Sequence, residues 1–142
     1  MSRIIAYLTF NGNCREAMEF YRDCLGGKLF FQTVGESPLS KKMPVKMKRR
    51  ILNSFLQSKN ILLMASDMVG DPGLIRGNSV SILIDCGTEK EIKLYYENLS
   101  KGGEAYYPVD ETFSGALFGS LTDRFGNHWL FNFNKKLKLK NE

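Results

Sequence analysis

Residues 7–27 decide the fold and read YLTFNGNCREAMEFYRDCLGG. Apolar and polar residues alternate through residues 4–10, which is the period of a strand. Asn13 and Glu16 have the spacing of a capping box, and the apolar positions after them recur at helical spacing until Gly26-Gly27. The order is therefore a strand, a capped helix and a glycine stop.

Three more strands complete the first half of the chain, and the sequence places them at residues 28–34, 50–57 and 61–66. Between the first two lies a polar, proline-containing insert at residues 35–49. A loop of this length in a compact domain is often a lid or an interface arm. Residues 67–78 are rich in glycine and have the composition of a linker.

The same order then recurs in the second half. Residues 79–86 alternate, Thr88 with Glu91 forms a second capping box, and Gly102-Gly103 ends the second helix. Strands are expected at residues 104–109, 117–122 and 128–133. We interpret this as an internal repeat within one α+β domain, in which each helix covers one face of a four-stranded sheet and the opposite faces curve around a shared cleft. The expected parts of the 142-residue domain are a first module (1–66), a linker (67–78), a second module (79–134) and a basic tail (135–142).

Cysteine usage favours a reducing compartment. The three cysteines are an odd number without CxxC spacing, which argues against disulfides and a zinc site. We expect Cys24 and Cys86 to be small core side chains, whereas Cys14, just after the expected helix cap, is the one open to exposure. A cytoplasmic protein is expected.

The net charge of +5 comes from two clusters, one at residues 41–50 and one at residues 135–140. A single-strand binder needs aromatic residues interleaved with such a patch, and the middle cluster has none. We interpret the clusters as a solvated connection and a tail, and expect no nucleic-acid partner. No apolar run reaches the roughly 18 residues of a membrane span, and no membrane partner is expected.

Several motifs match one known family, and together they cover the chain up to about Phe133. They are YLTFNGN (7–13), AMEFY (17–21) and LGG (25–27) in the first half, and GG (102–103), Pro108 and TDRFGNHW (122–129) in the second. The sequence resembles the PhnB-like branch of the vicinal-oxygen-chelate superfamily, which includes glyoxalases, bleomycin-resistance proteins and dihydroxybiphenyl dioxygenases. The resemblance implies paired βαβββ modules, a homodimer and a cleft inside the curved sheets.

Enzymes of this superfamily hold a divalent metal through side chains on the first and last strands of each module. The matching positions fall near Ile5, Leu63, Ser79 and Leu130, and none of these is a competent ligand. His128 is the only histidine, which excludes every site that needs two. We therefore expect no cofactor and disfavour a divalent metal.

The expected cleft is lined by hydroxyl, amide and imidazole groups that suit a small molecule. Its candidate lining residues are Tyr7, Thr9, Ser79, Ser81, His128 and Asn132. Asp123 is expected to organise the turn before His128 by accepting backbone amide hydrogen bonds. The leading hypothesis is a metal-independent small-molecule-binding protein. The alternative is a metal-dependent lyase, isomerase or dioxygenase in which His128 joins carboxylates around a metal.

Overall fold

The computed structural model describes residues 1–135. The chain forms two compact units, and the boundary between them along the sequence lies between Ile75 and Arg76. We call them module 1 and module 2. Module 1 contains β1 (Ala6–Thr9), α1 (Cys14–Leu25), β2 (Lys28–Thr33), the 3-10 helices η1 (Pro38–Lys42) and η2 (Val45–Met47), β3 (Ile51–Ser58) and β4 (Ile61–Ser66). Module 2 contains β5 (Ile82–Asp85), α2 (Glu89–Ser100), β6 (Glu104–Glu111), β7 (Leu117–Thr122) and β8 (His128–Phe133). The α+β fold with two βαβββ modules is confirmed.

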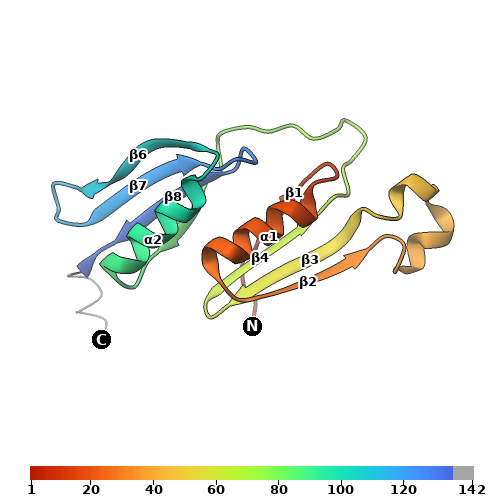
Figure 1. Ribbon diagram of the computed structural model, residues 1–142, viewed down its shortest axis with the longest axis horizontal. Coiled ribbons are helices and arrows are strands. Elements are labelled where there is room, and N and C mark those ends of the chain that lie inside the picture. The colour runs from red at the N-terminus through yellow and green to blue at the C-terminus, as the bar shows by residue number, and fades with distance from the viewer. Residues whose placement is uncertain (136–142) are drawn as a thin grey trace. The chain divides into compact units, whose positions relative to one another are not determined.

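Both sheets have the same topology. The strand orders are β1-β4-β3-β2 and β5-β8-β7-β6, so the first and last strands of each module lie side by side. That pair is parallel and the other neighbours are antiparallel. In each module the helix lies along one face of its own sheet (Figure 1). No helix of residues 1–135 covers the opposite face of its own sheet, which we call the open face.

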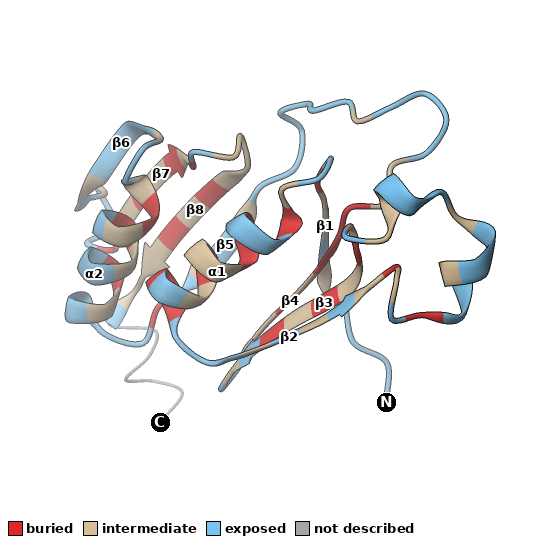
Figure 2. Cartoon of the chain, turned by 45° about the vertical axis from the view of Figure 1, so that its right-hand side comes forward, coloured by how far each residue is buried: buried red, intermediate tan, exposed pale blue. Residues whose placement is uncertain are grey.

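Helix α1 forms because its apolar residues fall on one side. Six residues spaced three or four apart are buried, namely Cys14, Ala17, Met18, Tyr21, Cys24 and Leu25. They pack on the alternate residues of the sheet, such as Leu56 and Ala65, which are fully buried. Figure 2 shows this buried side of α1 turned toward the strands.

The N-terminus of α1 is capped over a long sequence distance. The expected capping box is wrong, because the side chain of Asn13 makes no capping bond. Instead, Asp67 Oδ1 accepts hydrogen bonds from the backbone N–H groups of Gly12 (2.8 Å) and Cys14 (2.9 Å). Its Oδ2 accepts one from Ile51 N (2.9 Å). Asp67 therefore does the work of a cap, although it follows the last strand of module 1.

Helix α2 is capped locally, as the sequence predicts. Thr88 Oγ1 accepts a hydrogen bond from Glu91 N (3.0 Å). The Glu91 carboxylate in turn accepts one from Gly87 N (3.0 Å). The buried face of α2 consists of Ile92, Tyr96 and Leu99.

Each double glycine lets the chain pass close to a neighbouring strand. A Cβ atom on Gly27 would lie 2.6 Å from the Cβ of Ser58 and against the Gln57 carbonyl. A Cβ on Gly103 would lie 2.8 Å from the carbonyl carbon of Asp123 and against the Thr122 oxygen. The second glycine of each pair is thus needed for close backbone packing.

Several boundaries differ from the sequence expectation. Strands β1 and β5 are shorter than expected, since residues 4–5 and 79–81 lie outside the ladders. The insert at residues 35–49 contains η1 and η2. Cys14 is buried with no exposed surface, which corrects the expectation of an exposed thiol, whereas Cys24 and Cys86 are buried as expected. The expected basic tail lies outside the described residues apart from Lys135.

No helix in the described part of the chain is long and apolar enough to cross a membrane.

Candidate functional site

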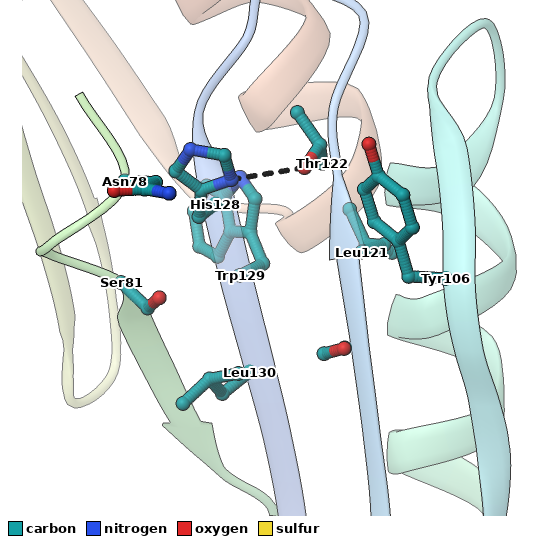
Figure 3. A pocket seen from close by; sticks show the side chains of 9 residues that line it. Asn78, Ser81, Tyr106, Leu121, Thr122, His128, Trp129 and Leu130 are labelled. Atoms are coloured by element: carbon teal, nitrogen blue, oxygen red, sulfur yellow. Dashed lines mark hydrogen bonds between the residues drawn. The ribbon is translucent and has the colours of Figure 1, made fainter. Parts of the chain in front are cut away.

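The open face of module 2 carries a pocket with a volume of about 270 Å³. It is lined by Asn78, Ser81, Tyr106, Ser120, Leu121, Thr122, His128, Trp129 and Leu130. The lining comes from the segment before β5 and from strands β6, β7 and β8 (Figure 3). All nine residues belong to module 2, so this pocket is formed within one module.

Strand alternation places the polar side chains in the pocket. In the β7–β8 register Thr122 pairs with His128 and Ser120 with Leu130, and cross-strand partners share a face. Leu121 pairs with Trp129 on the opposite alternation, and both are buried on the helix side. On the open face of these strands, Ser120, Thr122 and His128 therefore lie beside the apolar Leu130, while the other face belongs to the core.

His128 is held by hydrogen bonds at both ring nitrogens. Its Nε2 lies 3.1 Å from the carbonyl oxygen of Gly77. Because a carbonyl only accepts, Nε2 carries the proton and donates it. Nδ1 lies 2.9 Å from the Thr122 hydroxyl oxygen, and this hydrogen bond is drawn in Figure 3. The imidazole thus fastens the segment before β5 to the sheet.

The turn between β7 and β8 is held by the buried carboxylate of Asp123. Asp123 Oδ1 accepts from the backbone N–H groups of Phe125 (2.8 Å) and Asn127 (3.0 Å), as the sequence predicts. Its Oδ2 accepts from the indole Nε1 of Trp129 (2.8 Å). This network sets the β7–β8 turn and, through it, the position of His128.

Tyr106 forms the β6 side of the pocket. Its side chain is 60% exposed, and a hydrogen bond between its hydroxyl and the Glu104 carboxylate is the main reason that the pKa of Tyr106 is raised. Tyr106 stays neutral at physiological pH. None of the nine lining residues is an acid, a lysine or an arginine, so the pocket offers no fixed charge to a charged ligand and favours a neutral one.

Two of the predicted site residues, Ser81 and His128, lie together in this pocket. Ser79 is exposed nearby but does not line it. Asn132 lies farther along β8, where its amide donates to Asp85 Oδ1 (3.1 Å). Tyr7 and Thr9 lie on β1 in module 1.

The sequence reasoning missed Asn78, Tyr106, Ser120 and Thr122. Alternation along residues 117–122 would have placed Ser120 and Thr122 on the face of His128. Tyr106 had no such signal, because β6 shifts register against β7 between Glu104 and Tyr107. Such irregularities break the two-residue period on which the reasoning depends.

The open face of module 1 is apolar in its central row. Consecutive register partners across its four strands form what we call the apolar row: Tyr7, Met64, Phe55 and Phe30. The rings of Phe30 and Phe55 stack with centroids 4.8 Å apart. Tyr7 and Phe30 remain 55% and 50% exposed.

The described residues do not fit the divalent metal of the superfamily. Leu63, one of the expected ligand positions, is buried on the helix side, and its open-face neighbour Met64 is not a hard-metal ligand. Within residues 1–135, no three side chains of His, Cys, Asp or Glu lie close enough to share an ion. His128 already uses both nitrogens.

Comparisons with known proteins agree with the fold and the motifs. Protein PA1353 from Pseudomonas aeruginosa has a similar solved structure, with 36% identity, a TM-score of 0.79 and coverage of 94% of this chain and 98% of that one. A PhnB protein from Bacillus cereus shares 20% identity and the fold, with a TM-score of 0.72 and coverage of 94% and 100%. Protein YjdN of Escherichia coli K12 is 28% identical over 92% of this chain and 94% of its own length.

More distant structures with the same fold include proteins described as glyoxalase-related or as glyoxalase, bleomycin-resistance and dioxygenase proteins. A family model described as 3-demethylubiquinone-9 3-methyltransferase matches residues 2–131, nearly the whole chain. The chain therefore belongs to this PhnB-like family of glyoxalase-fold proteins.

Proposed function

We propose that this protein binds a compact, neutral small molecule in the pocket of module 2 and needs no metal ion to do so. The observation that carries the proposal is that both ring nitrogens of His128 form hydrogen bonds within the protein. Both nitrogens are engaged, one with the Thr122 hydroxyl and one with the Gly77 carbonyl, so the ring acts as a wall of the site.

The lining chemistry supports a ring-containing ligand with oxygen atoms. Ser81, Ser120 and Thr122 offer hydroxyls, and Asn78 offers an amide. Tyr106 and Leu130 add apolar surface. A volume of about 270 Å³ lies just below the usual range for drug-sized ligands, which favours a small compound. The family description names a methyltransferase of 3-demethylubiquinone-9, whose quinone headgroup is a neutral, oxygen-bearing ring of this chemical class.

Residues beyond the pocket belong to the proposal as well. Tyr7, Thr9, Ser79 and Asn132 remain predicted contacts of a larger cleft. We also propose that the protein is a homodimer and works in a reducing compartment such as the cytoplasm. The exposed apolar row and the three buried free thiols support these points. Light scattering on a sizing column tests the dimer.

A fragment screen tests the binding function. Neutral phenols, quinones and cyclic ketones are tested by thermal shift in excess EDTA, beside carboxylate analogues of the same rings. At a ligand concentration of about 100 times Kd, we expect neutral rings to raise the melting temperature by several degrees. The carboxylate analogues are expected to raise it by less. Ser120→Ala is expected to weaken binding about tenfold, and the matched Ser100→Ala on α2 to leave it unchanged.

Metal analysis separates this proposal from a metal-dependent lyase, isomerase or dioxygenase. Protein purified without chelators is expected to carry no stoichiometric zinc, nickel, manganese or iron. Stoichiometric metal that is lost in His128→Ala would reverse the assignment. A crystal structure in which the pocket is filled by the protein's own side chains would also end it.

A further inference from the structure

We propose that residues 35–49 of module 1, which we call the basic arm, bind the surface of a membrane rich in anionic lipid. The arm leaves the sheet after β2 and returns at β3, and η1 and η2 form its two turns. Figures 1 and 2 show these turns projecting beyond the ends of β2 and β3. The proposal does not depend on the pocket in module 2, and it revises the expectation from the sequence that there is no membrane partner.

The base of the arm is held in a defined conformation. Gly35 N donates to Lys48 O (2.9 Å), and Val34 N donates to Arg50 O (2.9 Å), so the two ends are bonded to each other. Ser37 is buried and caps η1 by accepting from Leu39 N (3.1 Å). The arm is therefore a preorganised projection, which lowers the ordering cost of binding.

The arm carries an excess of positive charge. Residues 35–49 contain five lysines and arginines and one acidic residue, Glu36, which gives a net charge of +4; the remainder has 15 basic and 14 acidic residues, a net charge of +1. Lys41, Lys42, Lys46 and Arg49 are exposed. The ion pairs Arg22–Asp23 and Lys93–Glu89 both lie outside the arm.

An exposed apolar side chain lies among these cations. Val45 is 80% exposed at the start of η2, next to the exposed Pro44 and Lys46. Cations around an apolar tip suit the interface of an anionic bilayer, where the charges meet lipid phosphates and the apolar group enters the headgroup region. Nucleic acid fits less well, because the arm has no aromatic residue on which bases would stack.

Vesicle co-sedimentation tests the proposal with the full-length protein. Vesicles of equal parts phosphatidylcholine and phosphatidylglycerol are compared with vesicles of phosphatidylcholine alone. We expect binding only to the anionic vesicles, and binding that weakens as salt increases. Replacing Lys41, Lys42 and Lys46 by glutamine is expected to reduce the affinity at least about 20-fold, given a roughly fivefold contribution per cation.

Two further variants test whether binding depends on the arm rather than on net charge alone, and whether the apolar side chain of Val45 contributes besides electrostatic attraction. A matched variant replaces the exposed Lys28, Lys90 and Lys101 by glutamine and is expected to keep its affinity within about threefold. Val45→Ser is expected to weaken binding about threefold and to leave the melting temperature unchanged, since the side chain is mostly exposed.

The proposal is overturned if both triple variants lose affinity equally, or if the protein binds neutral vesicles as well as anionic ones. It is also overturned if an RNA oligomer at the same phosphate concentration competes the protein off the vesicles and the arm variant abolishes that RNA binding.

Discussion

In module 1, the centre of the open face is the apolar row from Tyr7 to Phe30, with two stacked rings. In module 2, the open face carries a pocket lined by residues that include His128 and Thr122 and contain no acid, lysine or arginine. The two modules have the same strand order and the same parallel pairing. The repeated scaffold is therefore set by the buried face, while the open face is free to differ in chemistry.

The modules also differ in how they fix their helices. Module 1 uses Asp67, which lies 53 residues after Cys14 and joins the helix start to β3. Module 2 uses Thr88, directly before the helix. Asp67 therefore couples α1 to the far end of its module, whereas the α2 cap is independent of the strands that follow.

The largest expected loss of stability is at the close-packed glycine that follows the helix in both modules. Gly27→Ala and Gly103→Ala are each expected to destabilise by about 3 kcal/mol or more, because the added Cβ meets backbone atoms. Gly77→Ala is the control, since nothing lies within 4 Å of its Cβ position. Urea unfolding measures all three. A mild effect at either packed glycine would mean that the two helix exits are not equivalent.

Removal of the helix caps tests the difference between the modules. Asp67→Ala leaves three amide donors without their acceptor, two of them buried, and is expected to cost about 3 kcal/mol. Thr88→Ala removes one exposed capping bond and is expected to cost about 1 kcal/mol. Urea unfolding of both variants measures the two losses in the free energy of unfolding. Equal losses would contradict the long-range role of Asp67.

A smaller effect is expected at the pocket. His128→Ala removes the hydrogen bonds to Thr122 and Gly77 and is expected to cost about 1–2 kcal/mol. Hydrogen exchange should become faster around residues 76–81, while the amides of α1 keep their protection. Uniform loss of protection in both modules would show that His128 supports the whole fold rather than this segment.

A last prediction concerns a pH dependence in module 1, which is small near pH 9 and grows as the pH rises. Burial raises the pKa of the Cys14 thiol from 9.0 to about 12, partly offset by its contact with Ser54. Since the folded pKa is the higher one, the stabilisation is present below pH 9 and is lost as the pH rises toward 12. The stability advantage of the wild type over Cys14→Ala should narrow across this range. An advantage that stays constant would contradict the shift.

The sequence was sufficient for features that depend on local periodicity. Both helices, both double glycines and the Thr88 cap depend on residues close in the chain. Asp67 was assigned to a linker, because its hydrogen-bond donors are far away in the sequence. The burial of Cys14 was missed for the same reason, since it depends on how α1 packs against β3.

The candidate site was predicted only in part. His128 and Ser81 follow from alternation along β8 and just before β5. Asn78 lies in an irregular segment, and Tyr106 follows a register shift in β6, so neither has a periodic signal. The pocket depends on strand register, which the sequence of one chain does not specify at such irregularities.

An NMR titration tests directly whether the pocket of module 2 binds a neutral ring compound without a metal ion. The neutral ring compound with the largest thermal shift is added to ¹⁵N-labelled protein in excess EDTA. We expect saturable shifts at the amides of Asn78, Ser81, Thr122 and His128, and at the Trp129 indole. Shifts that appear only after a divalent metal is added, or that leave these pocket residues unaffected, would contradict the proposal.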